Sequence, residues 1–421
     1  MSRRKLFGAA GVTAAVVGRQ ARVPWPAGRR RPAPTFGGLD QPVPFRGERQ
    51  AGIITPQQDR MHFAAFDVTT DNRDDVIALL KQWTEMAERM TQGDDAVPNG
   101  AIGGNPYAPP DDTGEALGLP ASALTLTDRV RSVVLREGRQ GQVRHRRLSA
   151  RPALADLPKF TNEILDPARC GGDICVQACA HDPQVAVHAV RNLARVGFGT
   201  VAVRYSQLGF GRTSSTTREQ STPRNMLGFK DGTNNIKAED TEALDKNVWV
   251  AGGDGPDWLT GGTYLVTRRD SKSHRGVGPH NTARAGAGDR QAEGQRRTQR
   301  LRRRVRAGGL RHQGRQGHTA GRCRRPHPAG VHPIICSGIK MLRRGYNFTD
   351  GSDGFGHLDA GLFFIAFVRS PATNFIPVLA QMSGDALNEY IFHTGTAVFA
   401  CPPGLREGVT RRPTGVRQLF G

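Results

Sequence analysis

The chain alternates between short apolar runs and longer stretches in which apolar residues recur every three or four positions. Phe63–Val68 is a run of the first kind, and Arg73–Met90 is a stretch of the second kind. A short run predicts a buried strand, and the three-to-four spacing predicts an amphipathic helix. Asp71 or Asn72 would be the N-cap of that helix, since short polar side chains accept the first free N–H groups.

The pattern of strand and helix recurs along the chain. A strand is predicted at Gly171–Ala180, a helix at Pro183–Val196 and a strand at Gly199–Ser206, after a loop that covers Gly93–Gly118. Near the C-terminus, strands at Leu362–Val368 and Thr396–Ala400 flank helices at Phe375–Met382 and Asp385–Tyr390.

Two such halves predict a duplicated α+β fold. Each half would be ferredoxin-like, with an antiparallel sheet and helices on one face, and the pair would resemble a dimeric α/β barrel. We expect the halves to cover residues 59–220 and 223–415, with a hinge at Ser221–Pro223. We also expect Phe63–Val68 and Phe363–Val368 to be equivalent strands.

The formal net charge of +21 is concentrated in three segments. Residues 1–35, 129–151 and 271–330 carry +8, +7 and +14, so the rest of the chain carries −8. A strongly basic chain suggests a nucleic-acid partner. However, the segment 271–330 lacks the aromatic residues with which single-strand binders stack on bases. We therefore predict no nucleic-acid partner.

Two of the basic segments depart from the composition of a folded protein. The large aliphatic and aromatic residues of 271–330 are only Val277, Leu301, Val305 and Leu310. Such a segment buries too little apolar surface to offset the entropy of its own ordering. A composition of Arg, Gly, Gln, His and Pro is typical of a GC-rich gene read out of frame. The hypothesis is that 128–150 and 269–335 are frame-shifted; the alternative is that they are genuine.

The first residues predict export. Arg3 and Arg4 precede a modestly apolar stretch, Ala9–Gly18, and this pattern resembles a twin-arginine signal. The stretch is too short to span a bilayer. The protein would then be periplasmic, in the cell envelope or extracellular, with residues 1–35 as the signal. The alternative is a disordered basic tail.

The cysteines point to packing rather than to metal binding. Cys170, Cys175 and Cys179 are spaced by five and four residues, which fits no common zinc or haem-attachment motif. Cys175 and Cys179 are predicted to lie in a buried strand, where free cysteine packs as a small hydrophobic residue.

One glycine-rich turn presents a single acid. In Gly228-Phe229-Lys230-Asp231-Gly232 the carboxylate of Asp231 lies between two glycines, and Thr233, Asn234 and Asn235 follow. Glycine allows positive φ and the close approach of a flat ligand. The alternative is an ordinary Asp-Gly turn whose side chains cap their own backbone.

A second motif changes the balance between these alternatives. Gly338-Ile339-Lys340-Met341-Leu342-Arg343-Arg344-Gly345-Tyr346-Asn347-Phe348 follows far downstream. Together the two motifs resemble the dye-decolourising (DyP-type) haem peroxidases, in particular their exported, deferrochelatase-like branch. The resemblance covers roughly residues 59–127, 152–268 and 337–407. It implies haem b as the cofactor, H2O2 and a small organic, dye-like reductant as the substrates, and it leaves homo-oligomer formation open.

The resemblance also assigns roles to residues. Cleavage of H2O2 needs a proton moved from one oxygen to the other and a positive charge beside the leaving hydroxide. Asp231 matches the family's proton-transfer acid and Arg343 its guanidinium. Arg344 is expected to pair with a haem propionate or a structural acid. Gly232, Thr233 and Asn234 are expected to lie against the haem edge.

The iron ligand is where the sequence departs from the family. The resemblance implies a histidine shortly before Arg343, and the candidates are His312, His318, His327 and His332. His327 has the most suitable separation, so it is the candidate ligand of the haem iron. Pro326 and Pro328, however, oppose the helix that should hold it. A second functional class shares the same pocket, namely a haem-processing protein that releases iron from haem.

Overall fold

The computed structural model describes most of the chain outside its basic segments. The described residues are 41–105, 107–130, 133–137, 143–147, 154, 156–272, 338–353, 356–382, 388 and 391–406. The predicted signal at 1–35, the segment 273–337 with His327, and the predicted helix at Asp385–Tyr390 except for Asn388 lie outside the described residues.

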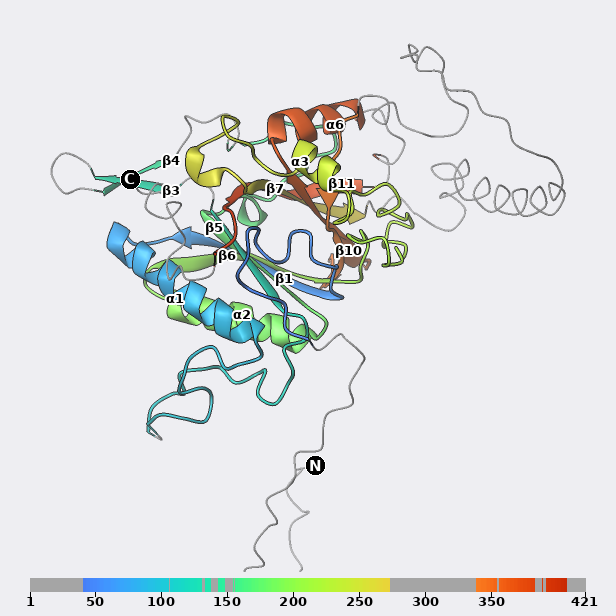
Figure 1. The fold of residues 1–421 in the computed structure, drawn as a ribbon. Coiled ribbons are helices and arrows are strands. Elements are labelled where there is room, and N and C mark those ends of the chain that lie inside the picture. Colours follow the sequence, from blue (N-terminus) through green and yellow to red (C-terminus); the bar gives the residue numbers. More distant parts are fainter. Residues whose placement is uncertain are drawn as a thin grey trace, which may run out of the picture. The chain divides into compact units, whose positions relative to one another are not determined.

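The N-terminal half has the ferredoxin-like order of elements. Its strands pair antiparallel in the order β2-β5-β1-β6, and α1 and α2 lie side by side on one face of this sheet (Figure 1). The bounds are β1 Arg60–Val68, α1 Arg73–Thr91, β2 Thr125–Val130, β5 Ile174–Ala180, α2 Pro183–Val196 and β6 Val201–Phe210.

The helices form where the spacing of apolar residues predicted them. The Asn72 side chain accepts a hydrogen bond from the backbone N–H of Asp74 at 2.9 Å, so it is the N-cap of α1. The Asp182 side chain caps α2 in the same way. Trp83 on α1 packs against Phe66 of the sheet with ring centroids 5.1 Å apart. One apolar face of each helix therefore covers the sheet.

The C-terminal half repeats the arrangement. Its strands follow the order β11-β7-β10-β9, and the two-residue strand β8 also pairs with β10. The bounds are β7 Thr263–Lys272, β8 Leu342–Arg343, β9 Tyr346–Ser352, β10 Leu358–Val368, a π-helical turn Pro371–Phe375, α6 Ile376–Gln381 and β11 Ile391–Cys401. Shorter elements are α3 Thr241–Asn247, the 3-10 turns Pro167–Arg169 and Asp257–Leu259, and a separate hairpin of β3 Val133–Glu137 and β4 Val143–Arg147.

Two single pairings join the halves into a closed barrel. Val130 of β2 pairs with Ala400 of β11, and Phe210 of β6 pairs with Asn347 of β9. Aromatic rings from both halves fill the interior. The ring centroid of Phe63 lies 5.2 Å from that of Phe363 and 6.2 Å from that of Phe399. The predicted duplicated ferredoxin-like fold is confirmed.

The predicted equivalence of Phe63–Val68 and Phe363–Val368 is wrong. Phe63–Val68 lies in β1, the first strand of its half, whereas Phe363–Val368 lies in β10, the third long strand of its half after β7 and β9. Both are central strands, and Phe63 faces Phe363 across the barrel. The first and third strands of a half are both central and buried on two faces, so they have the same apolar pattern. The pattern therefore cannot tell which of the two a given strand is.

Sheet pairing extends into both suspect segments. Asp128, Arg129 and Val130 pair with β5, and Arg269 to Lys272 pair with β11. Cys175 and Cys179 are fully buried in β5, as predicted, and burial raises the pKa of the Cys175 thiol. No helix within the described ranges is long and apolar enough to cross a membrane.

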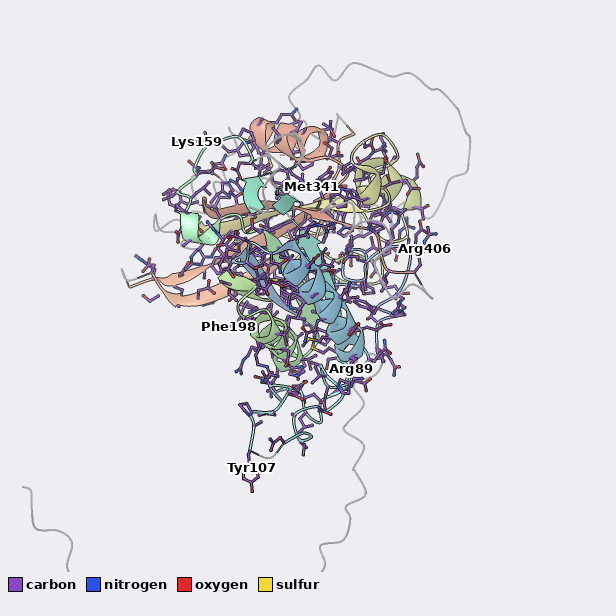
Figure 2. The ribbon with its side chains drawn as sticks, turned by 90° about the vertical axis from the view of Figure 1, so that its left-hand side faces the viewer. Arg89, Tyr107, Lys159, Phe198, Met341 and Arg406 are labelled. Atoms are coloured by element: carbon purple, nitrogen blue, oxygen red, sulfur yellow. The ribbon has the colours of Figure 1, made fainter. Side chains whose placement is uncertain are left out.

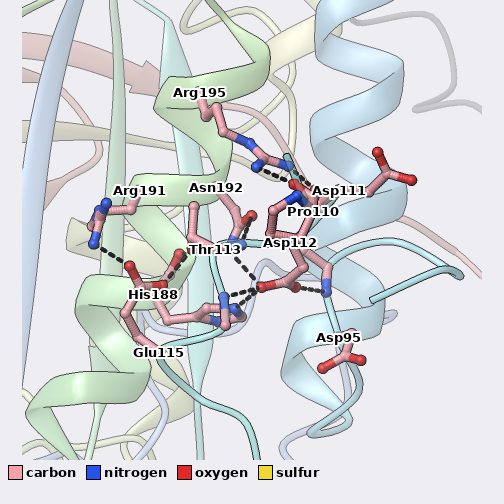
Figure 3. A network of polar contacts seen from close by, with 12 residues as sticks. Asp95, Pro110, Asp111, Asp112, Thr113, Glu115, His188, Arg191, Asn192 and Arg195 are labelled. Atoms are coloured by element: carbon pink, nitrogen blue, oxygen red, sulfur yellow. Dashed lines mark hydrogen bonds and ion pairs between the residues drawn. The ribbon is translucent and has the colours of Figure 1, made fainter. Parts of the chain in front are cut away.

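A buried carboxylate ties the long loop between α1 and β2 to α2. The tip of the loop projects into solvent at Tyr107 (Figure 2). Its base is held by Asp112, which accepts hydrogen bonds from the backbone N–H groups of Ala96 at 2.6 Å and Gly114 at 2.7 Å (Figure 3). The Nε2 atom of His188 lies 2.7 Å from the same carboxylate. Asp112 therefore holds the base of the predicted loop, and Arg195 of α2 adds contacts to the Pro110 and Asp111 carbonyls.

These partners set the charge of Asp112. Burial opposes ionisation of the carboxyl most strongly, but the N–H of Gly114, the His188 ring and the N–H of Ala96 together outweigh it. The pKa of Asp112 therefore lies below its usual range. A carboxylate whose pKa is lower in the folded state contributes stability above the unfolded pKa of about 3.9, and loses it as the pH falls through the folded value.

We predict that Asp112→Asn lowers the free energy of unfolding by about 1–3 kcal/mol at pH 7, because an amide cannot accept all of these hydrogen bonds. The loss should begin to shrink as the pH falls below about 4, where the carboxyl of the unfolded wild-type chain takes up a proton, and it should shrink further as the pH falls through the lower folded pKa. Urea denaturation at several pH values measures both effects. Asp111→Asn, at the exposed neighbouring residue, is the control. An equal loss at pH 7 and pH 3 would contradict the assignment.

Candidate active site

The turn around Asp231 is held by its own backbone and by one amide side chain. The Asn225 side chain accepts from the N–H of Phe229 at 3.0 Å, and the Asn225 N–H donates to the carbonyl of Phe229 at 2.8 Å. Gly228 has φ of +92°, which a side chain would strain. The part of the turn that precedes Asp231 therefore has a fixed shape, as the glycine pattern predicted.

Gly232 is required for space rather than for its φ angle. A Cβ atom here would lie 2.6 Å from the Oγ1 of Thr222 and 2.8 Å from the backbone N of Ser215. The Lys237 ammonium closes the other side, donating to the Ser215 carbonyl at 2.6 Å and to the Gly232 carbonyl at 3.3 Å. Burial, reinforced by the charge of Arg343, lowers the pKa of Lys237. The turn is thus packed against the segment that joins the two halves.

Asp231 is bonded through both carboxylate oxygens. Its Oδ1 forms an ion pair with the guanidinium of Arg343, and its Oδ2 accepts from the Ser214 hydroxyl at 2.8 Å. Asn235 clamps Arg343 through its backbone: the Arg343 N–H donates to the Asn235 side chain at 2.7 Å, and that side chain donates back to the Arg343 carbonyl at 2.8 Å. The two residues predicted to act on peroxide are therefore in direct contact.

The other residues of the two motifs have different positions. Asn234 lines the same cavity as Asp231 and Arg343, but Gly232 and Thr233 do not appear among its lining residues, and Thr233 is exposed. Arg344 was expected to pair with an acid, and this expectation is wrong: none of its described contacts is with an acid. Arg344 is fully buried and donates to the Thr55 and Pro56 carbonyls and to the Gln58 side chain. Neutral oxygens are the described partners of this guanidinium, which lies inside the fold and does not line the cavity.

A cavity of about 660 Å³ lies between the C-terminal sheet and α6. Leu362 and Phe364 of β10 form part of the sheet wall, while Phe375, Val378 and Leu379 form the opposite wall. The alternate residues of β10, such as Phe363 and Ile365, point into the barrel instead. The lining is therefore apolar along its length, with polar groups at its ends.

The strand register separates the two polar ends. Arg343 lies opposite Ala366 on β10, whereas Asp270 lies opposite Leu362 on β10 and opposite His393 on β11. Four residues along a strand and three strand spacings place the Cα atoms of Arg343 and His393 roughly 20 Å apart. Asp231 and Arg343 thus occupy one end of the cavity, and the pair of Asp270 and His393 occupies the other.

The second end contains an incompletely satisfied cation. Arg268 is 2% exposed, pairs with Glu163 at 2.6 Å and lies over the Phe160 ring. Its Nε and Nη2 atoms are buried without a hydrogen-bond partner among the described residues. Buried guanidinium groups normally have partners. This end therefore suits an anionic group on a ligand.

The described residues fit a porphyrin, but they leave its iron ligand unassigned. A largely apolar cavity of about 660 Å³ with a guanidinium group in its lining suits a macrocycle that carries carboxylates. His393 is the one imidazole among the lining residues of the described cavity, and its Nδ1 lies 2.6 Å from Asp270. The strand register places it at the polar end away from Arg343, so it is not at the end that contains Asp231. His327 lies outside the described residues.

Sequence reasoning missed the residues that support Asp231. Ser214 and Lys237 bond the turn from outside it, and Thr222 limits it to glycine at residue 232. Asn235 was noted only as part of the turn, whereas its role is to clamp Arg343. The run of four consecutive small hydroxyl residues, Thr213-Ser214-Ser215-Thr216, is the signal in the sequence that could have pointed to this segment. All four are buried in the structure.

Comparison with known proteins agrees with this geometry. The model of the Dyp-type peroxidase N-terminal domain matches residues 50–211, and that of the C-terminal domain matches 222–273 and 326–406. The dye-decolorizing peroxidase of Thermobifida fusca is 32% identical over 85% of this chain and 81% of its own. A deferrochelatase of Yersinia pestis is 30% identical over 96% of this chain and 92% of its own.

Solved structures show the same similarity. Ferric DtpA from Streptomyces lividans superposes with a TM-score of 0.69 at 28% identity, covering 92% of this chain and all of that one. The C-terminal match leaves residues 274–325 uncovered, within the segment whose composition departs from that of a folded protein.

We predict that Asp231→Asn leaves haem affinity nearly unchanged while slowing the reaction with H2O2 by about 10²–10⁴-fold, the usual contribution of a general acid–base group. The amide keeps the size of the side chain but cannot take up the proton. Stopped-flow mixing with H2O2 measures the rate, and Glu239→Gln, at an exposed acid of the same loop, is the control. Equal rates for wild type and Asp231→Asn would remove Asp231 from the mechanism.

Proposed function

The chain belongs to the DyP-type peroxidase family and is a haem peroxidase, and we propose that Asp231 and Arg343 perform its reaction with H2O2 beside a haem b beneath α6. The observation that carries this assignment is the contact between the two side chains at one end of an apolar cavity. An isolated surface pair would not line a cavity or be clamped through its backbone.

The residues divide the chemistry between them. The Asp231 carboxylate takes the proton from one oxygen of H2O2 and delivers it to the other, so that the O–O bond breaks with water as the leaving group. The Arg343 guanidinium stabilises the negative charge that develops on the departing oxygen. Bound haem supplies the redox centre that receives the oxidising equivalents. Asp231 ends the step as it began, ionised beside Arg343.

The cavity supports haem b, which is held by contacts and not by covalent bonds to the protein. None of the four described cysteines lines the cavity, so none is placed to form a thioether with a porphyrin. Arg268 would bind one of the porphyrin carboxylates, while Leu362, Phe364 and Val378 would cover its faces. A pyridine haemochrome spectrum of the loaded protein identifies the haem type.

Small organic donors of the dye type are the proposed reductants, since one relative is named a dye-decolorizing peroxidase. A second candidate function is iron release from haem, because a relative covering 96% of the chain is named a deferrochelatase. The same cavity would serve both reactions. Steady-state oxidation of a dye with H2O2, compared with free iron released from added haem, distinguishes them.

We predict that His327→Ala leaves the Soret absorption band of the haem-loaded chain unchanged. Ligation needs a histidine on a rigid element, and Pro326 and Pro328 deny it a helix. Restoring the family reading frame upstream of Gly338 should raise both haem binding and peroxidase activity. Loss of the Soret band in His327→Ala would instead identify His327 as the iron ligand.

We also propose export by the twin-arginine route, on the strength of Arg3 and Arg4 before Ala9–Gly18. Replacing both arginines with lysine should retain the protein in the cytoplasm, because the charge is kept while the paired guanidinium groups are lost. Fractionation of cells that express the full chain measures this. Equal export of both forms would leave residues 1–35 as a basic tail.

A further inference from the structure

Four buried hydroxyl side chains lie between the two segments that match the family models. The matched ranges end at residue 211 and resume at residue 222, and Thr213, Ser214, Ser215 and Thr216 fall in this gap. All four are at most 1% exposed. Each hydroxyl has a described partner, so the segment is a built part of the fold rather than a loose connection between the halves.

The four partners differ in kind. Thr213 donates to the Gly345 carbonyl at 2.6 Å, and Thr216 donates to the Thr55 carbonyl at 2.8 Å. Ser215 bonds the hydroxyl of Thr222 at 2.6 Å. Ser215 also accepts from the Lys237 ammonium at 2.8 Å. Ser214 is the one of the four whose described bond reaches a carboxylate, the Oδ2 of Asp231 at 2.8 Å. The two threonine hydroxyls bond backbone carbonyls, which is a structural role. The Ser214 hydroxyl instead bonds the carboxylate that is proposed to transfer the proton.

Ser214 is itself held in place. Its backbone N–H donates to the Gln57 side chain at 3.2 Å, and that side chain also donates to the Gly345 carbonyl at 2.7 Å. Gly345 follows the two arginines of the second motif, so Ser214 is fixed relative to the strand that carries Arg343. The hydroxyl bonds the Oδ2 atom of Asp231, whereas Arg343 contacts the Oδ1 atom of the same carboxylate.

We propose that Ser214 is a positioning residue for peroxide cleavage, which holds Asp231 in the orientation and charge state that proton transfer requires. With Arg343 on one oxygen and Ser214 on the other, the carboxylate can rotate about neither of its bonds without breaking a contact. A hydroxyl is also both donor and acceptor. It donates to Oδ2 while Asp231 is ionised, and it can turn to accept once Oδ2 carries the proton from H2O2.

This dual capacity separates Ser214 from Arg343, which can only donate. Hydrogen bonds to a charged group are stronger than those between neutral groups. Loss of the hydroxyl would leave one buried carboxylate oxygen without its donor and leave Asp231 free to turn towards Arg343. The inference rests on the proposed role of Asp231, because Ser214 is argued to act only through that carboxylate.

The test is a double-mutant cycle in the haem-loaded full chain. Ser214→Ala should slow the reaction with H2O2 by about 10- to 100-fold, the range expected for a hydrogen bond to a charged group. In the Asp231→Asn background the same substitution should change the rate by less than about twofold, since the carboxylate it supports is already gone. Ser214→Cys, with a weaker donor of similar size, should fall between Ser214→Ala and wild type.

Two further measurements separate positioning from general damage. Thr216→Val removes a neighbouring buried hydroxyl with nearly the same shape, and it should leave the rate within about twofold of wild type. The infrared carboxylate bands assigned to Asp231, from the difference between wild type and Asp231→Asn, should shift in Ser214→Ala without added H2O2. Haem affinity and the Soret band should stay unchanged in both hydroxyl variants.

The outcomes are distinguishable. Wild-type rates in Asp231→Asn would overturn the proposed function itself. A slow Asp231→Asn with an unchanged Ser214→Ala would overturn only the role of Ser214. Equal losses from Ser214→Ala in both backgrounds, or equal losses from Thr216→Val, would show that the hydroxyl segment is merely structural.

Discussion

The ion pair between Asp231 and Arg343 joins residues 112 positions apart, and the site exists only because the barrel brings them together. Asp231 comes from a turn packed on the segment between the halves, whereas Arg343 comes from a strand of the C-terminal sheet. Neither charge is stable alone in a partly buried place, because an unpaired buried charge is costly. The paired state therefore fixes the turn and the strand relative to one another.

Several other buried arginines show how the fold treats charges that are not used for chemistry. Arg344 is surrounded by carbonyl oxygens, and Arg129 bonds the Gln177 side chain and lies over the Phe367 ring. Each is fully buried within the barrel region. Each of the three also keeps at least one buried nitrogen without a described partner, but Arg268 differs because it lines the cavity. Position at the cavity thus distinguishes the guanidinium group that a ligand could reach from those enclosed by the fold.

The sequence predicted local features well and long-range placement poorly, for physical reasons. The helices α1 and α2 and the cap at Asn72 follow from spacing and side-chain chemistry within a few residues. Asp231 and Arg343 could be identified because each belongs to a recognisable motif. Strand order could not, since β1 and β10 are equally apolar. The acid expected for Arg344 was wrong because only the folded chain reveals which side of a strand faces the cavity.

The polar groups of the cavity are spread along the strand register. Arg268 lies opposite Phe364 on β10 and Arg343 lies opposite Ala366, so two residues and two strand spacings place their Cα atoms roughly 12 Å apart. A ligand bound to Arg268 can therefore extend along the apolar wall towards the end that carries Arg343 and Asp231. Interactions that are equal in the ground state and the transition state improve binding but do not speed the reaction. In the proposed mechanism, the contacts of Asp231 and Arg343 with the oxygens of H2O2 strengthen in the transition state and therefore speed the reaction. Haem processing would then use the apolar walls and Arg268, whereas peroxidase turnover would also use Asp231, Arg343 and the Ser214 hydroxyl.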